Sequence, residues 1–248
     1  MKLLNKFSSL EAYNNYINNR DYITPNIGLI DHNGGIYFNS YQPISITYNF
    51  IDLGLPSGTL WCEQNIGAQN DYDPGLYFSW ANTIGISIDD DQSNYTIAYD
   101  DGENSFTKYM EDIDNKYILD LEDDAANIII GNGAYIPSPD QWVELSENCT
   151  KMWITNYNNS GINGILCTSN INDNSIFLPA VGKIDQYNIQ YDGFNFEGIY
   201  QSNETYHEWD NLYIKPTTFT ENGIYMWDND SQVSRYWIIS IRAAKDSI

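Results

Sequence analysis

Two short stretches of this sequence place tryptophan beside carboxylate and amide side chains. One is YHEWDNLY at residues 206–213, and the other is YMWDNDS at residues 225–231. An indole face stacks on a sugar ring, while Asp and Asn oxygens bind hydroxyl groups or ligate Ca²⁺. The alternative is that each Trp belongs to the core and each Asp-Asn pair forms a turn. We predict a ligand-binding site made of Trp209, Asp210, Asn211, Trp227, Asp228 and Asn229.

Motifs of known catalytic sites are absent from the sequence. His32 and His207 have polar, turn-like neighbours and no G-x-S-x-G serine or nucleophilic cysteine beside them. The chain has no H-E-x-x-H, C-x-x-C or Walker A motif. Glycoside hydrolysis needs a pair of carboxylates, but among 34 Asp and Glu residues some pair will lie close enough by chance. The presence of such pairs is therefore weak evidence for this activity. We therefore predict that the protein is not an enzyme, and a carboxylate-based hydrolase is the less favoured alternative.

The charge balance excludes several classes of partner. Asp and Glu outnumber Lys and Arg by 34 to 11 in a chain of 248 residues, which gives a net charge of −23. Such a surface repels nucleic acid phosphates and anionic membranes. The sequence has no run of 18 apolar residues and no apolar signal-peptide core at its N-terminus. We expect no nucleic acid partner, no membrane insertion, no signal peptide and synthesis in the cytoplasm.

The acidic residues are concentrated between residues 89 and 124. This region has thirteen Asp or Glu residues against Lys108 and Lys116, a local net charge of −11. A solvated loop is favoured over a cation site. DDDQSNYTIAYD lacks the Gly and Glu that an EF-hand loop requires at its sixth and twelfth positions. We predict no cofactor, and Ca²⁺ is left open without a recognisable motif.

The cysteine count is low and odd. Cys62, Cys149 and Cys167 do not make a disulfide framework. Buried free thiols are favoured over a disulfide pair.

The elements that must position these residues fall into two parts. Residues 1–47 predict a helix from Ser8 or Ser9 and a hairpin around HNGG, a unit too small to bury a core alone. From residue 48 onwards, short strands and tight turns are interrupted by two helices. One is predicted at LEDDAANIII, with acidic residues in its first turn and Gly131 near its C-cap. The other starts at SPDQ, where Ser138, Pro139 and Gln141 form a capping box.

The line FIDLGLPSGTLWCEQNIGA at residues 50–68 resembles the V-D-L-G-L-P-S-G-T-x-W-A-T-C-N-V-G-A opening of the Fibrobacter succinogenes major paralogous domain, known as FISUMP. The resemblance spans about residues 49–244. Where the family has a Cys in this opening block, this chain has Gln64. If the family Cys pairs with the Cys of the later N-C-T block, then Cys149 of this chain lacks that partner. Later blocks that agree in order are GLYFSWANT, SFTKY, LEDDAA, IPSPDQWVELSENCT, GINGILCTSNINDNSIFLPAVG and ISIRAA.

The resemblance implies an α+β, C-type lectin-like or formylglycine-generating-enzyme-like domain over residues 48–248. Such domains have two helices, a small twisted antiparallel sheet, long loops and paired terminal segments. The near-neutral line at residues 51–68 is then the first core strand and turn, with WIISIRAA as its partner. Bends are expected at Gly54 and Gly58, and core side chains are expected at Leu53, Leu55, Leu60 and Trp61.

Function is expected from the same resemblance. We expect a non-enzymatic virion protein of a bacteriophage, such as a head fibre, a capsid decoration or a tail-associated component. Residues 1–47 would attach it to other virion proteins, with a homo-oligomer expected, and the lectin-like domain would contact a host glycan or surface protein. The alternative is a bacterial surface or cytoplasmic binding module. A formylglycine-generating-like enzyme is disfavoured because the three cysteines lack the spacing of a reactive pair.

Overall fold

The chain divides into two compact units, Met1–Thr47 and Tyr48–Ile248. The attachment role predicted for the first unit stays a prediction. The computed structural model of the protein describes residues 5–6, 28–30, 36–38, 46–88, 95–103, 105–185, 190–206, 212–226 and 233–247.

The first unit contains a small antiparallel sheet of short strands. These are β1 (Asn5–Lys6), β2 (Gly28–Ile30) and β3 (Ile36–Phe38), arranged in the order β1-β3-β2. The pairing of β2 with β3 confirms the hairpin predicted around HNGG. The turn itself and the helix predicted from Ser8 or Ser9 lie outside the described residues.

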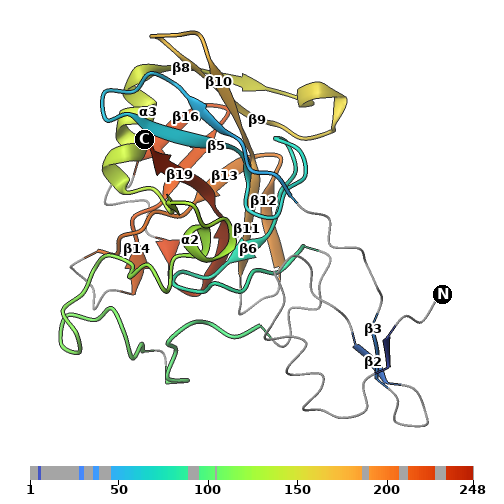
Figure 1. The fold of residues 1–248 in the computed structure, drawn as a ribbon, viewed down its shortest axis with the longest axis vertical. Helices are drawn as coiled ribbons and strands as arrows, with labels where there is room; N and C mark the ends of the chain where they lie inside the picture. The colour runs from blue at the N-terminus through green and yellow to red at the C-terminus, as the bar shows by residue number, and fades with distance from the viewer. Residues whose placement is uncertain are drawn as a thin grey trace. The chain divides into compact units, whose positions relative to one another are not determined.

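The described part of the second unit combines two α-helices with four small sheets (Figure 1). Its α-helices and strands are β4 (Phe50–Asp52), β5 (Thr59–Asn65), β6 (Tyr77–Phe78), α2 (Ala125–Ile129), β7 (Ala134–Tyr135), α3 (Pro139–Asn148), β8 (Cys149–Ile154), β9 (Gly164–Ser169), β10 (Ser175–Pro179), β11 (Val181–Asp185), β12 (Gln190–Phe194), β13 (Glu197–Tyr200), β14 (Tyr213–Ile214), β15 (Thr217–Thr220), β16 (Gly223–Met226), β17 (Val233–Ser234), β18 (Trp237–Ser240) and β19 (Arg242–Asp246).

The sheets are mostly antiparallel. A seven-stranded sheet has the order β12-β11-β18-β13-β15-β16, with β6 paired to β18, and its β13 runs parallel to β11 and β18. The smaller sheets are β4-β5-β19-β7, β10-β9-β8 and β14-β17. The predicted α+β class is confirmed, but the prediction of one small sheet is wrong. The strands are short and separated by turns, so the hydrogen bonding is divided among four sheets. Asn is common in the backbone conformation of such turns, and six of the ten described non-glycine residues with positive φ are Asn.

The opening line pairs with the end of the chain, as the resemblance implies. β19 lies antiparallel to β5, with Ala244 opposite Trp61. The predicted partner WIISIRAA is divided, however, because its first half forms β18 in the seven-stranded sheet. Only its second half, β19, pairs with the opening line.

The opening line also provides core side chains. Leu53, Leu55 and Trp61 are buried as predicted, and Trp61 packs against Trp142 of α3 with ring centroids 4.6 Å apart. Leu60 is only half-buried, so its predicted core position is wrong. Leu60 neighbours Trp61 along β5, and successive side chains of a strand point to opposite faces.

The predicted bends of this line are confirmed. Gly54 has φ 64° and Gly58 has φ 75°, a region that L side chains rarely adopt. Between them, the backbone N–H and hydroxyl of Ser57 donate hydrogen bonds to Glu144 of α3, at 2.8 Å and 2.5 Å. The turn is therefore attached to the helix that follows it by 87 residues.

A fully buried arginine connects β19 to its neighbours. The guanidinium of Arg242 donates to the carbonyl oxygens of Cys62, Glu63 and Phe177 and to Oδ1 of Asn65, over 2.5–3.0 Å. These acceptors lie on β5 and β10, so one side chain joins three strands from two sheets. A buried charge is tolerated when its donors are satisfied in this way.

Helix α3 begins at the predicted capping box. Ser138 Oγ accepts from the backbone N–H of Gln141 at 3.2 Å, and Gln141 Oε1 accepts from the N–H of Ser138 at 2.9 Å. Trp142 and Leu145 are buried as predicted. Cys149, predicted on the same helix face, is buried as the C-cap and first residue of β8.

Helix α2 is shorter than predicted. Its N-cap is Asp124, whose Oδ1 accepts from the N–H of Ala126 at 2.8 Å, so the acidic residues precede the first turn instead of lying in it. Asp124 Oδ2 also accepts from the N–H of Ile136 at 2.8 Å, which connects α2 to the strand after it. Gly131 follows the C-cap with φ 66°, as predicted. Neither this nor any other helix among the described residues has the length and apolar character needed to cross a membrane.

The three cysteines are free thiols in the buried interior, as predicted. Burial raises the pKa of Cys149 to about 11 and that of Cys167 to about 12. A thiol with a raised pKa is a poor nucleophile, because the reactive form is the thiolate.

Candidate binding surface

The predicted ligand-binding residues lie outside the described part of the chain. This holds for Trp209, Asp210, Asn211, Trp227, Asp228 and Asn229, and also for both histidines. The site that they are predicted to form stays a prediction. The structure nevertheless describes the residues that flank both segments.

A two-stranded sheet brings these flanking residues together. β14 begins shortly after residues 207–211, and β17 begins directly after residues 227–232. The two strands pair antiparallel, with Tyr213 opposite Ser234. The N–H of Tyr206 donates to the carbonyl of Tyr213 at 3.0 Å. Both Trp-Asp-Asn segments are therefore attached to one small sheet.

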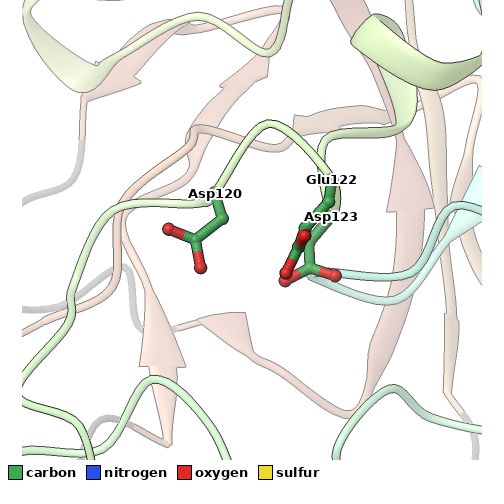
Figure 2. A group of neighbouring side chains, drawn as sticks. All are labelled: Asp120, Glu122 and Asp123. Atoms are coloured by element: carbon green, nitrogen blue, oxygen red, sulfur yellow. The ribbon is translucent and has the colours of Figure 1, made fainter.

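One lysine of the acidic region pairs with three carboxylates at its C-terminal end. Lys108 Nζ lies 2.6 Å from Asp123 Oδ2, 2.9 Å from Asp120 Oδ2 and 3.3 Å from Glu122 Oε1. Figure 2 shows that the three carboxylates come from one loop, with Asp120 on one side of it and Glu122 and Asp123 on the other. We call these four residues the Lys108 cluster. The prediction of a solvated loop fits the exposed Glu111, Asp112 and Glu122, but it is wrong for Asp123 and Asp124, which are buried.

Two tyrosines complete the hydrogen bonding of Asp123. Tyr99 donates its hydroxyl to Oδ1 at 2.7 Å, and Tyr109 donates to Oδ2 at 2.5 Å. The N–H of Asp120 in turn donates to the Tyr109 hydroxyl oxygen at 2.9 Å. The ammonium of Lys108 lies 4.8 Å from the Tyr109 ring centroid, within the range of a cation–π contact.

The cluster is charged at neutral pH. Burial disfavours the ammonium of Lys108, but hydrogen bonds to Asp120 and Asp123 outweigh burial and raise the pKa of the lysine. Hydrogen bonds from Lys108 and Lys116 lower the pKa of Asp120 to about 2. Burial also opposes ionisation of Asp123, yet hydrogen bonds from Lys108, Tyr109 and Tyr99 lower its pKa.

The three carboxylates also have the geometry of a cation site. One ligand oxygen from each of Asp120, Glu122 and Asp123 lies within 4.8 Å of the others, and carboxylate oxygens are the ligands that Ca²⁺ prefers. The ammonium of Lys108 already contacts all three side chains, so part of their negative charge is balanced from within the chain. The prediction of no cofactor, with Ca²⁺ left open, stays a prediction.

Reasoning from composition missed this cluster, although the sequence held a signal for it. Lys108 and Tyr109 belong to the block SFTKY, and Glu122 and Asp123 belong to the block LEDDAA. Both blocks carry the resemblance to the FISUMP family, and they contact each other across 15 residues through the bond from Lys108 to Asp123.

A shallow pocket of about 420 Å³ lies beside the cluster. Its lining pairs with the residues that precede the first Trp-Asp-Asn segment. Ile118 forms an isolated β-bridge with Glu204, and the N–H of Thr205 donates to the Tyr117 carbonyl at 2.9 Å. Thr205 also bridges to Ile214 of β14. The lining consists of Asn115, Lys116, Tyr117, Ile118, Leu119, Asp120 and Glu204.

The carboxylates of the pocket are paired with lysines. Lys116 Nζ donates to both oxygens of Asp120 at 2.9 Å and 2.7 Å, and Lys215 donates to Glu204. A carboxyl group that acts as a general acid needs a raised pKa, whereas the pKa of Asp120 is lowered to about 2.

The chain matches no family model, no curated protein and no solved structure.

Proposed function

We propose that the chain is a non-enzymatic structural and binding protein of a phage particle. Residues 48–248 would form a C-type lectin-like domain that contacts a glycan or protein on the host surface. Residues 1–47 would attach the chain to other virion proteins, with the homo-oligomer predicted from the sequence. The protein would be synthesised in the bacterial cytoplasm and located in the virion.

The observation that carries the proposal is the pairing of β5 with β19. The resemblance to the FISUMP family implies paired terminal segments, and the structure places Arg242 opposite Asn65, 177 residues earlier in the chain. A domain closed in this way exposes the loops between its ends, and binding residues are disproportionately found on loops that a rigid scaffold positions. The pairing supports the lectin-like class without assigning a ligand.

The described residues that flank the two Trp-Asp-Asn segments support a binding role. Those flanking residues pair in the β14–β17 sheet, and Glu204, which precedes the first segment in the sequence, lines the shallow pocket. A surface of this kind makes modest contacts in each copy. Many copies on one particle would raise the overall avidity by about 10²–10⁴ if the geometry allows simultaneous binding.

The test is quantitative mass spectrometry of density-gradient-purified phage particles from the source culture. We expect a fixed copy number relative to the major capsid protein. A chain lacking residues 1–47 should be absent from particles, whereas the matched double variant Trp209→Ala/Trp227→Ala should be incorporated normally and adsorb more weakly to host cells. Absence of the full-length protein from purified particles would refute the virion proposal and leave a cellular binding module.

A further inference from the structure

Three asparagine–glycine steps lie within the described residues. They are Asn132–Gly133, Asn163–Gly164 and Asn222–Gly223, whereas Asn33–Gly34 lies outside the described residues. In such a step the backbone nitrogen of the glycine can attack the side-chain amide carbon of the asparagine, because glycine has no Cβ to hinder the approach. Asparagine is thermolabile for this reason. In a folded chain the attack requires that the asparagine side chain and the glycine nitrogen are free to meet.

The step at Asn132–Gly133 is open. It lies in the connection from α2 to β7, and both residues are exposed. Within the described part of the chain, neither residue makes a hydrogen bond. A Cβ placed on Gly133 would meet no atom within 4 Å apart from its chain neighbours. The turn is closed instead by the N–H of Ala134, which donates to the Gly131 carbonyl at 3.0 Å. The side chain of Asn132 can therefore reach the Gly133 nitrogen while this turn stays closed.

The step at Asn163–Gly164 is held by the fold. Oδ1 of Asn163 accepts from the N–H of Asn156 at 2.9 Å, and its Nδ2 donates to the Asn195 carbonyl at 3.0 Å. Gly164 is buried in β9, which is paired with β8 on one side and with β10 on the other. Attack at this step therefore requires a middle strand of the sheet to open, which happens only through local unfolding.

The step at Asn222–Gly223 is intermediate between these two. Asn222 is exposed, but its N–H donates to Oγ1 of Thr220 at 3.2 Å. Gly223 is paired with Thr220 at the closed end of the β15–β16 hairpin. Fraying of this end would free the step, and fraying costs less free energy than opening a middle strand.

We propose that Asn132 is a site of spontaneous chemical modification in the folded protein, where Gly133 and a water molecule convert the side-chain amide to a carboxylate. The backbone nitrogen of Gly133 loses its proton and forms a bond to Cγ of Asn132. The bond from Cγ to Nδ2 breaks, and ammonia leaves with that proton. Water then opens the cyclic imide. Attack of water at Cγ gives aspartate, and attack at the main-chain carbonyl carbon gives isoaspartate.

The products change a turn that connects two fixed elements. The backbone N–H of Ile136 donates to Asp124 Oδ2 at 2.8 Å, which connects the start of α2 to the residue after β7. β7 in turn pairs with β19. Aspartate adds one negative charge to the turn, and isoaspartate also lengthens the backbone between α2 and β7 by one atom. This modification goes beyond the proposed function and does not depend on the location of the protein in a virion.

The experiment follows the full chain during incubation at mildly alkaline pH, in the folded state and in guanidinium chloride. Samples are digested and mapped by mass spectrometry, and isoaspartate is detected with an isoaspartate-specific methyltransferase. In the folded chain we expect Asn132 to convert first and Asn222 more slowly. Asn163 should convert about tenfold more slowly than Asn132, or slower still, because its step opens only by local unfolding. In guanidinium chloride the three steps should convert at similar rates.

The matched variants are Asn132→Gln and Asn222→Gln, which change two exposed amides in other respects alike. Asn132→Gln should remove the first conversion, whereas Asn222→Gln should leave it unchanged, and both variants should melt like the wild type. Conversion of Asn163 or Asn222 before Asn132 in the folded chain would overturn the proposal. So would an Asn132 that converts in guanidinium chloride and stays intact in the folded chain. Absence of the protein from phage particles would refute the proposed function and leave this result unchanged.

Discussion

Replacing Lys108 by Met should lower the free energy of unfolding, because three carboxylates lose the ammonium that pairs with them. The methionine keeps most of the length and apolar stem of the lysine but removes the ammonium that contacts three carboxylates. Asp123 is the most affected, because its side chain is only 10% exposed. Asp120 keeps its bonds to Lys116, and Glu122 is 77% exposed and loses little.

The size of the effect follows from these exposures. Losing one charged hydrogen bond to a largely buried carboxylate costs about 1.5–3 kcal/mol. A fully buried pair would cost about 3–5 kcal/mol, but Tyr99 and Tyr109 continue to donate to Asp123 and Lys108 itself is 18% exposed. We therefore expect a loss of about 2–3 kcal/mol in the free energy of unfolding. In a protein of this size that corresponds to a Tm lower by about 4–12 °C.

The same variant should gain affinity for a divalent cation. With the Lys108 ammonium removed, only Lys116, which bonds Asp120, balances three carboxylates whose ligand oxygens lie within 4.8 Å of one another. Ca²⁺ at about 100 times its Kd would restore about 2.7 kcal/mol. The wild type, in which Lys108 contacts the same oxygens, should melt at nearly the same temperature with Ca²⁺ and with a chelator.

The assay is urea unfolding followed by tryptophan fluorescence, repeated with Ca²⁺ and with a chelator. The control is Lys151→Met, which removes an exposed lysine that bonds only to Ser146 among the described residues. A loss below about 1 kcal/mol in Lys108→Met would show that the cluster contributes no more than a surface ion pair. Equal stabilisation of the wild type and the variant by Ca²⁺ would refute the idea that the lysine takes the place of a cation.

Three further predictions address other parts of the fold. Hydrogen bonds lower the folded-state pKa of Asp120 to about 2 and also lower the pKa of Asp123. The two ionised carboxylates therefore stabilise the fold fully above the unfolded-state pKa of about 3.9. This stabilisation is lost as the pH falls from about 4 towards 2. The unfolding free energy should therefore drop more steeply over this range in the wild type than in Lys108→Met, and parallel curves would contradict the assignment. Arg242→Met should cost about 3–5 kcal/mol in urea unfolding, since four buried oxygen acceptors lose their donor, and a cost below about 1 kcal/mol would refute this account. A thiol reagent should label none of the three cysteines in the native protein and all three in guanidinium chloride, because the thiols are buried with raised pKa values, and rapid native labelling of any one would contradict this.

Much of the candidate binding surface could not be predicted from the sequence. The count of acidic residues in 89–124 indicated a solvated loop, whereas Asp123 and Asp124 are buried and hydrogen-bonded. Whether a carboxylate is solvated or paired depends on a lysine 15 residues away and on two tyrosine hydroxyls, and composition does not reveal such distances. Only the folded chain shows that the blocks SFTKY and LEDDAA touch.

The sequence by itself determined the features that depend on neighbouring residues. The capping box at Ser138, the place of Gly131 after a C-cap and the hairpin around HNGG follow from interactions within a few positions, so local chemistry was enough to predict them. Tertiary structure alone decided that WIISIRAA is divided between two sheets and that Lys108 pairs with three carboxylates of its own acidic loop. These features require segments far apart in the chain to meet, and the free energy of such a contact depends on the burial and hydrogen bonding that exist only after the chain has folded.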